Sequence, residues 1–217
     1  MPALIEPVVL EGRHVRLVPL TLAHVPALLA AGNVSRETYG FTVVPATEAT
    51  MTSYVETALR EQREGRSVPF ATLEAASSRV VGCTRFAFIE HWDWPAEVPP
   101  DREAAAAEAV EIGWTWLSAT AQRTGINTEA KLLMLTHAFE TWRVYRVHLK
   151  TDSRNVRSRA AIERLGAKFD GILRAHSPAS EGGVRDAAWY SILDGEWPEV
   201  KERLAARLEP AAAATLG

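Results

Sequence analysis

The sequence of 217 residues contains a single cysteine, Cys83, and lacks the short motifs of several enzyme classes. With one cysteine, no disulfide can form within the chain, and a reducing compartment is expected. Cys83 lies in the apolar run VVGCTRFAF, so we expect a buried structural thiol rather than a nucleophile. The absence of H-E-x-x-H, C-x-x-C and G-x-S-x-G argues against metal-dependent and serine-hydrolase chemistry, and no metal is expected. The absence of G-x-x-x-x-G-K-[ST] argues against a nucleotide-binding switch.

Long hydrophobic runs and an excess of positive charge are also absent. No apolar run approaches the ~20 residues that a membrane span needs, and the start MPALIEPVVLEGR lacks the regions of a secretory signal. The formal net charge is −3, so direct binding of nucleic acid is not expected. Arg154, Arg157 and Arg159 form a local basic group, which is either a solvated helix start or a ligand-facing surface. We therefore expect a cytoplasmic protein without a membrane partner.

Strand and helix patterns alternate along the chain without an internal repeat or linker. The helical pattern after Thr47 ends at Gly65, and another runs from about Thr128 to Trp142. Further helices are predicted in TLAHVPALLAAG, NVRSRAAIERLGA and PEVKERLAARL. Strands are predicted in HVRLVPL, SVPFATLEA, RVVGCTRFAFIE, VEIGWTWL, YRVHLKTD, KFDGILRAH and VRDAAWYSIL. This order predicts a single α/β domain over 1–209, with 210–217 as a frayed tail.

One segment, His91–Ala109, is long for a connection between two neighbouring strands. It contains the stretch HWDWPAEVPPDREAAAAEA. The segment is either a lid or interaction surface, or a disordered insertion, and the sequence leaves both interpretations open.

The stretch QRTGIN connects the strand pattern VEIGWTWL to a helical pattern. The start of a helix leaves backbone N–H groups without intrahelical partners, and these groups together with the helix dipole bind anions such as phosphate. Gly125 permits close approach of a ligand and tolerates positive φ. Gln122 and Arg123 can add side-chain donors, and Asn127 or Thr128 can cap the helix. An ordinary loop before a capped helix is the alternative interpretation.

The element order, together with Gln122-x-x-Gly125-x-Asn127, resembles the GCN5-related N-acetyltransferases (GNAT). In that superfamily a Q/R-x-x-G-x-G/A turn holds the pyrophosphate of acetyl-CoA. Asn127 replaces Gly or Ala here, a mild departure because Asn tolerates left-handed backbone conformations.

A second stretch, TDSRNVRSRAAIERLGAKFDGILR, is similar to the N-x-x-S/A motif and the helix that follows it. The pattern from EIGWTW to VRDAAWYSILDGEWPEVK is similar to the RimJ/RimL-like branch, which includes ribosomal-protein N-terminal acetyltransferases. The resemblance covers the chain from LEGRHVRLVPL to EWPEVKERL. It implies a mixed, mostly antiparallel central sheet of about seven strands, splayed between strands 4 and 5 and flanked by helices.

The resemblance also implies where the cosubstrate acetyl-CoA is held. The turn binds the pyrophosphate, the backbone of the fourth strand pairs with the pantetheine amides, and an N–H near Trp114–Trp116 faces the acetyl oxygen. Asn155 serves as a pantetheine contact, a helix N-cap, or both. Ser158 is a cofactor contact or the acid that protonates the leaving thiol, because the tyrosine that many members place in this helix is missing. The expected cofactor-binding residues are Trp116, Leu117, Gln122, Arg123, Thr124, Gly125, Ile126, Asn127, Thr128, Asn155 and Ser158.

Glu111 is the leading candidate for the general base, acting directly or through water. A carboxylate in the apolar strand VEIGWTW requires an explanation, because burial of an unpaired charge is unfavourable. Burial would also raise its pKa toward a useful range. A structural ion pair, for instance with Arg85, is the alternative. His176 is a second candidate, since its ordinary pKa suits proton transfer, although an exposed histidine on a turn is the simpler expectation.

Aromatic and acidic side chains in the long segment are candidates for binding the acceptor. Trp92, Asp93, Trp94 and Glu97 suit a protonated amine or a peptide N-terminus, with His176 as a further substrate contact. The same side chains suit a dimer contact, and both a monomer and a homodimer remain open.

The sequence therefore predicts an acetyl-CoA-dependent N-acetyltransferase that transfers the acetyl group directly to a primary amine. The acceptor is a protein N-terminus or a small amine. The alternative is a non-catalytic acyl-CoA-binding or interaction protein on the same scaffold.

Overall fold

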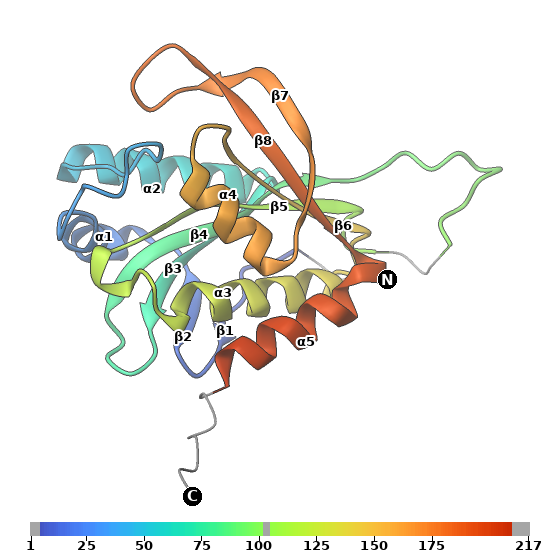
Figure 1. Cartoon of the computed structure of the whole chain (residues 1–217), viewed down its shortest axis with the longest axis horizontal. Helices are drawn as coiled ribbons and strands as arrows, with labels where there is room; N and C mark the ends of the chain where they lie inside the picture. The colour runs from blue at the N-terminus through green and yellow to red at the C-terminus, as the bar shows by residue number, and fades with distance from the viewer. Residues whose placement is uncertain (1–4, 102–104, 210–217) are drawn as a thin grey trace, which may run out of the picture.

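The computed structural model describes residues 5–101 and 105–209. The tail 210–217 and part of the long loop, 102–104, lie outside the described residues. A central sheet contains eight strands in the order β1-β2-β3-β4-β5-β6-β8-β7. The strands are β1 Leu10–Glu11, β2 Val15–Pro19, β3 Ser67–Glu74, β4 Val80–Glu90, β5 Ala109–Leu117, β6 Arg146–Asp152, β7 Lys168–Pro178 and β8 Val184–Leu193 (Figure 1).

The sheet is mixed and mostly antiparallel, which confirms the predicted fold class. Only β5 and β6 pair in parallel, and all other neighbours in the described sheet are antiparallel. The additional strand is β1, in which Leu10 pairs with Leu17. Two residues are too few to produce the alternation by which a strand is recognised in a sequence.

The predicted splay lies between β5 and β6. Their pairing begins at Ala109 with Arg146 and its last pair is Glu111 with His148. Beyond that pair, β5 continues along β4 and β6 continues along β8. The two strands therefore part at Glu111, in the middle of the sheet.

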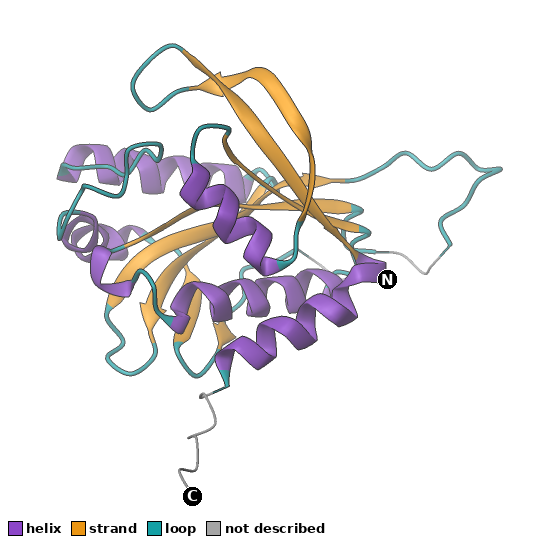
Figure 2. Ribbon diagram, viewed as in Figure 1, coloured by secondary structure: helices purple, strands orange, loops and turns teal. Residues whose placement is uncertain are grey.

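Helices cover both faces of the sheet (Figure 2). Side chains of α1 and α2 pack on β3 and β4 from one side, and α3, α4 and α5 pack on the other side. No helix among the described residues is long and apolar enough to cross a membrane. The helices are α1 Val25–Gly32, α2 Glu48–Arg63, α3 Gly125–Thr136, α4 Val156–Leu165 and α5 Trp197–Leu208.

The caps of α2 and α4 follow from local sequence. The Thr47 hydroxyl accepts a hydrogen bond from the backbone N–H of Thr50, and Asn155 Oδ1 accepts one from Ser158 N at 3.0 Å. Gly166 ends α4 with a φ of 104°, a conformation that favours glycine. These boundaries confirm the predictions made for the two helices.

Helix α3 begins earlier than predicted. Its N-cap is Thr124, whose hydroxyl accepts a hydrogen bond from Ile126 N at 3.3 Å, so Asn127 and Thr128 lie inside the helix rather than at its cap. The extended backbone of Thr124 brings its hydroxyl to the helix start, as an N-cap requires. The helix continues as a π-helical segment over His137–Thr141.

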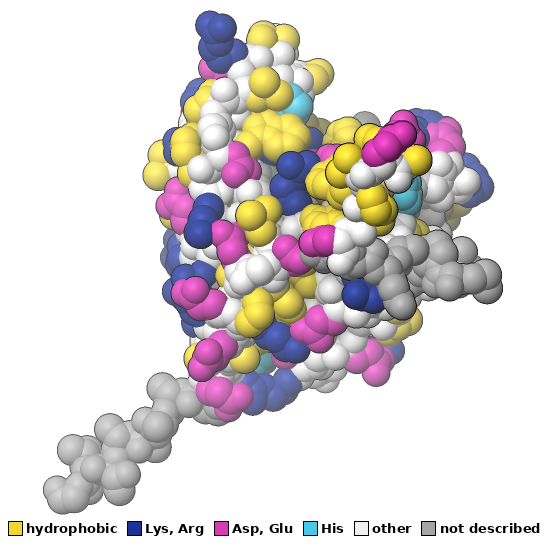
Figure 3. All heavy atoms as spheres, turned by 90° about the vertical axis from the view of Figure 1, so that its right-hand side faces the viewer, with side chains coloured by type: hydrophobic (Ala, Val, Ile, Leu, Met, Phe, Trp, Pro, Cys, Tyr) yellow, Lys and Arg dark blue, Asp and Glu magenta, His cyan; other side chains and the backbone are white. Residues whose placement is uncertain are grey.

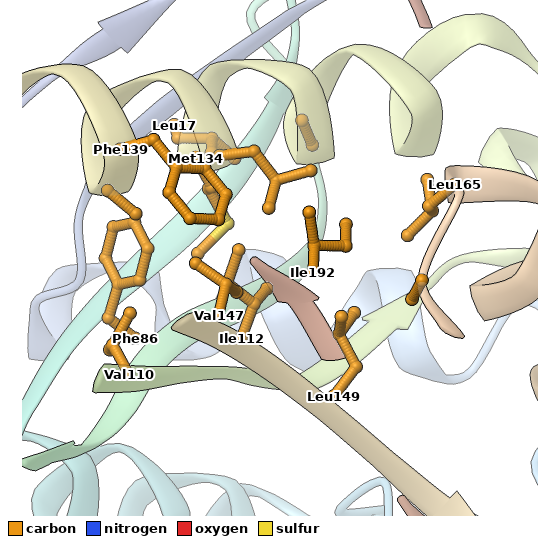
Figure 4. Packing of buried hydrophobic residues seen from close by; sticks show 14 of the residues in the cluster. Leu17, Phe86, Val110, Ile112, Met134, Phe139, Val147, Leu149, Leu165 and Ile192 are labelled. Carbon is orange, nitrogen blue, oxygen red and sulfur yellow. The ribbon is translucent and has the colours of Figure 1, made fainter. Parts of the chain in front are cut away.

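The larger hydrophobic core lies between the sheet and α3, α4 and α5. Figure 4 shows Met134 of α3 and Phe139 of the π-helical segment above the strand residues Phe86, Ile112 and Val147. A carboxylate also fixes α3 in place, because Glu129 accepts hydrogen bonds from three consecutive backbone N–H groups at the start of β2. Consequently, the start of α3 is held at a fixed position beside the sheet.

The described part of the long loop after β4 projects away from the sheet (Figure 1). Trp92 stacks on Tyr145 with ring centroids 5.7 Å apart, and Trp94 packs against both rings. Trp94 Nε1 donates a hydrogen bond to Glu108. The first residues of the loop are therefore held against the start of β6.

Candidate active site

A buried carboxylate lies at the point where β5 and β6 part. Glu111 is 2% exposed, and its Oε2 lies 2.6 Å from Lys150 Nζ and 3.6 Å from His148 Nε2. Glu111 is thus ion-paired, as the alternative interpretation expected, but the partner is Lys150 and not Arg85, whose guanidinium pairs with Glu61 of α2 at 2.6 Å. Because Glu111 pairs with His148 across the strands, Lys150 lies two residues further on the same face of β6.

The backbone of β5 bulges just after this carboxylate. The register with β4 shifts between Cys83 and Arg85, and Trp114 adopts a φ of 49°. A bulge inserts an extra residue in one strand and redirects its side chains and backbone groups. Trp114 consequently lies over the Arg85 guanidinium, 4.3 Å from it, and is 37% exposed.

The thiol beside this bulge is buried. Cys83 is 3% exposed, and burial raises its pKa to about 11. The expectation of a buried structural thiol is therefore confirmed.

A buried lysine supports the bulge from the opposite side of the sheet. Lys131 of α3 is 4% exposed, and its Nζ donates hydrogen bonds to Thr115 Oγ1 at 2.6 Å and Thr84 Oγ1 at 3.1 Å. Both hydroxyls also contact the carbonyl of Gly113. Burial lowers the pKa of Lys131 to about 7. Sequence analysis missed this residue, although a lysine in the apolar helical stretch AKLLML is a recognisable signal.

Replacing Lys131 with Met is expected to flatten the pH dependence of stability. Between the folded-state pKa of about 7 and the ordinary value of 10.5, the unfolded chain binds a proton that the folded chain lacks. The contribution of Lys131 to the free energy of unfolding therefore rises with pH in this interval, by at most about 1.4 kcal/mol per pH unit. Above the ordinary thiol pKa of 9.0 the raised pKa of Cys83 contributes the opposite slope, so the comparison is made below that pH. Denaturant unfolding across the interval measures the slope. Lys201→Met, at an exposed lysine, serves as the control and should keep the wild-type slope; a wild-type slope in Lys131→Met would contradict the prediction.

Aromatic side chains surround the ammonium of Lys150. Its Nζ lies 4.0 Å from the ring centroid of Phe88, 5.0 Å from that of Trp189 and 5.9 Å from that of Trp114. We call Phe88, Trp114, Trp189 and Glu111 the ammonium cage. Aromatic faces and a carboxylate together stabilise a cation.

Sequence analysis missed Lys150, Phe88, Trp189 and His148 as site residues. The alternation of His148, Lys150 and Asp152 along β6 places their side chains on one face of the strand. This spacing could have identified Lys150 and His148 as candidate site residues from the sequence. The sequence does not reveal that β8 brings Trp189 opposite Lys150.

His176 lies close to this cage rather than on a turn, so that expectation is wrong. It belongs to β7, and its ring meets Trp189 edge-on with centroids 5.3 Å apart. Partial burial and then the charge of Lys150 lower its pKa below the usual histidine value. The lowered pKa favours the neutral imidazole, the form that can accept a proton.

Two ring nitrogens of the same stack are buried without a hydrogen-bond partner in the described part of the chain, His148 Nδ1 and Trp189 Nε1. The two rings stack with centroids 5.1 Å apart. Such groups are uncommon in folded proteins and call for an explanation at each site.

Figure 3 shows hydrophobic, histidine and basic side chains gathered beside a notch where the β7–β8 hairpin rises next to the loop after β4.

The turn before α3 is tied to three other segments through Gln122. Its Nε2 donates to Thr38 Oγ1 and to the carbonyl of Leu117, and its Oε1 accepts from Arg157. The positive φ in the turn belongs to Arg123, at 61°, and not to Gly125. Gln122 thus stabilises the turn and brings the Arg157 guanidinium of α4 beside it. The other two members of the basic group lie elsewhere, since Arg154 pairs with Asp152 and Glu181 and Arg159 donates to Tyr190.

Further predicted cofactor-binding residues lie around the same turn. Trp116 packs in the core under α1 and α2, with its ring edge-on to Tyr39. The carbonyl of Leu117 accepts hydrogen bonds from both Tyr39 and Gln122. Because a carbonyl oxygen has two lone pairs, this one is fully used.

The predicted acceptor residues Trp92 and Trp94 lie against Tyr145 at the start of β6, as described above. Asp93 is exposed between them.

A separate pocket of about 280 Å³ lies between the α1–α2 loop and the tip of the β7–β8 hairpin, where Ser180 donates a hydrogen bond to the carbonyl of Gly40. Its lining contains none of the cage residues. Over residues 5–101 and 105–209, no group of three or more His, Cys, Asp or Glu side chains is arranged to hold a metal ion.

Comparisons with known proteins identify the family and the fold of the chain. Residues 14–168 match the acetyltransferase (GNAT) domain family model, and no significant match is found among curated proteins. A GCN5-related N-acetyltransferase from Brucella melitensis is 31% identical, with a TM-score of 0.78, covering 94% of this chain and 87% of its own. A structure from T. thermophilus assigned to the acetyltransferases is 38% identical, with a TM-score of 0.75, covering 94% and 98% of the two chains.

The RimJ/RimL-like branch is represented among the structural neighbours. Mycobacterium smegmatis RimJ in complex with CoA-disulfide has a TM-score of 0.74 at 20% identity, covering 93% of this chain and 95% of its own. This likeness shows a shared fold. Since the family model spans most of the chain and two solved relatives exceed 30% identity, the chain belongs to the GNAT acetyltransferase family.

Proposed function

We propose that the chain is an acetyl-CoA-dependent N-acetyltransferase that transfers the acetyl group directly to a primary amine in the cytoplasm. The observation that carries this proposal is the position of Glu111. It is a nearly fully buried carboxylate at the point where β5 and β6 part, between a backbone bulge and the aromatic rings of the ammonium cage. A proton acceptor, a place for a cation and exposed strand backbone meet there.

The residues at the turn fit the diphosphate of acetyl-CoA. The first N–H groups of α3 have no carbonyl partner within the helix, although that of Ile126 donates to the Thr124 hydroxyl. Arg123 is exposed in the turn, and Arg157 is held beside it through Gln122. Backbone donors, the positive end of a helix dipole and two guanidinium groups favour a multiply charged anion.

The strand edge next to Glu111 fits the pantetheine arm. Beyond the last β5–β6 pair, the edge of β5 that faces the splay no longer pairs with β6, so it can bind an extended amide-containing chain as an added strand does. Asn155, at the start of α4, supports the same arm in the proposal. Acetyl-CoA supplies the activated acetyl group when bound.

Within this proposal Glu111 accepts the proton of the acceptor's ammonium, directly or through water. Backbone N–H groups at the bulge, near Trp114–Trp116, stabilise the negative charge that develops on the carbonyl oxygen. Ser158 protonates the departing thiolate or contacts the cofactor. His176, whose pKa is lowered by partial burial, offers a second proton acceptor beside the cage.

The acceptor is proposed to be a protein N-terminus or a small amine, entering over the exposed faces of Phe88 and Trp114. Trp92, Asp93 and Trp94 border the entrance in this proposal. A structural neighbour named RimL, a ribosomal L7/L12 alpha-N-protein acetyltransferase, supports a protein acceptor by analogy of fold. The alternative, a non-catalytic acyl-CoA-binding protein, gains support from Lys150, which occupies the carboxylate that an acceptor amine requires.

A thiol-release assay with an amine panel tests the proposal. Purified protein is incubated with acetyl-CoA and with small amines or short peptides that bear free N-termini, and the products are identified by mass. At least one class is expected to raise CoA release above hydrolysis and to carry the acetyl group on nitrogen. Tight acetyl-CoA binding with no responsive amine would instead favour the non-catalytic alternative.

A further inference from the structure

We propose that Lys150 is a self-acetylation site, modified by the protein's own active site when no acceptor is bound. This inference rests on the proposed function, because it uses the same acetyl donor and the same base. It assigns to the chain an internal substrate, the Lys150 side chain, and a modification that alters the charge of the acceptor site.

The position of Lys150 is that of an acceptor amine. Its Nζ lies 2.6 Å from Glu111 Oε2, the proposed proton acceptor. The ring centroids of Phe88 and Trp189 lie 4.0 and 5.0 Å from the same nitrogen. A bound acceptor cation would need a carboxylate and aromatic faces of this kind, and in this structure the Lys150 side chain makes these contacts.

Lys150 also lies at the right place along the sheet. It follows the last β5–β6 pair by two residues, so it projects beside the edge of β5 where the pantetheine arm is proposed to lie. The Trp114 ring of the bulge is 5.9 Å from its Nζ. Only 10% of the Lys150 side chain is exposed. Its nitrogen is therefore poorly hydrated, and little water has to be displaced before a thioester can approach it. Proximity of this kind greatly accelerates a reaction between two groups.

The chemical step balances without any further reagent. Glu111 accepts a proton from the Lys150 ammonium, and the free amine attacks the thioester carbonyl of acetyl-CoA. The new C–N bond forms as the C–S bond breaks, and the attacking nitrogen loses a second proton to the departing thiolate to give free CoA. Glu111 then releases the first proton to solvent. The product is an amide, which removes the positive charge and leaves Glu111 without its ion-pair partner.

The other lysines provide internal controls. The chain has only four, Lys131, Lys150, Lys168 and Lys201. The side chains of Lys168 and Lys201 are 74% and 46% exposed and pair with surface carboxylates. Lys131 is buried on the opposite side of the sheet under the bulge. Uncatalysed acetylation would favour the two exposed lysines, whereas reaction within the site would favour Lys150.

Incubation of the full chain with acetyl-CoA and no acceptor tests the proposal. Intact mass and peptide mapping follow the modification, while calorimetry on the same sample measures acetyl-CoA binding. We expect one acetyl group per chain on Lys150, appearing at least about tenfold faster than on Lys168 or Lys201 because of its proximity to the donor. An acceptor amine that enters the cage should slow this modification.

Three variants sharpen the result. Lys150→Arg keeps the positive charge and should abolish the modification, Glu111→Gln should slow it strongly, and Lys168→Arg should leave it unchanged. Acetylation concentrated on the exposed lysines, or none on Lys150 in protein that binds acetyl-CoA, would overturn the inference and leave the proposed function intact. Failure to bind acetyl-CoA at all would overturn both.

Discussion

Replacing Glu111 with Gln is expected to lower kcat for amine acetylation by about 10²–10⁴-fold, the usual contribution of a positioned general base. The amide has the shape of the carboxylate but does not accept a proton from the ammonium. The affinity for acetyl-CoA should stay close to that of the wild type, because the turn before α3 is held by Gln122, which bonds Leu117 and Arg157, and the pantetheine arm is proposed to pair with strand backbone. Initial-rate kinetics and calorimetry measure the two quantities separately.

The matched control is Glu61→Gln. Glu61 is also a carboxylate on the α2 side of the sheet and pairs with Arg85 at 2.6 Å, but it does not touch the cage. Its replacement should change kcat little. Since the Glu111 variant leaves Lys150 without a partner, thermal unfolding of each protein accompanies the kinetics. A folded Glu111→Gln protein with wild-type kcat would show that this residue is not the base.

Replacing Gly125 with Asp is expected to weaken acetyl-CoA binding by about 100-fold or more, corresponding to roughly 3 kcal/mol. Gly125 is the first residue of α3, where backbone N–H groups face the proposed phosphate position. A carboxylate there repels the phosphates and offsets the helix dipole. Calorimetric titration measures the affinity, and circular dichroism establishes that the protein is folded.

Gly125→Ala separates crowding from charge. A Cβ at this position would lie 3.1 Å from the His14 ring, so the alanine variant carries the steric effect without the charge. It should bind acetyl-CoA more weakly than the wild type but far more tightly than Gly125→Asp. Equal affinities of the alanine and aspartate variants would contradict phosphate binding at this turn.

Much of the fold follows from local sequence. Thr47, Asn155 and Gly166 mark helix ends through caps that depend only on nearby residues. The start of α3 was harder to predict, because Thr124, Asn127 and Thr128 are all capable caps within one turn, and the choice depends on how the preceding strand ends. The short β1 has no periodic pattern and forms only because Leu10 finds a partner in β2.

The site was predictable only in part, for a similar reason. Glu111 stands out in its own strand, but its partner comes from β6 and the aromatic rings come from β4, β5 and β8. Strand alternation assigns faces, whereas the contact between Glu111 and Lys150 depends on the parallel register of two strands separated by a helix. Arg85 lies on the antiparallel neighbour β4, but its guanidinium pairs with Glu61 of α2.

The central claim is direct transfer of the acetyl group to an amine, and initial-rate kinetics test it most directly. Rates of CoA release are measured with wild-type protein while acetyl-CoA is varied at several fixed concentrations of a responsive amine. Direct transfer requires both substrates to be bound together, so the double-reciprocal lines should intersect. Parallel lines, the pattern of a covalent acetyl-enzyme intermediate, would contradict direct transfer.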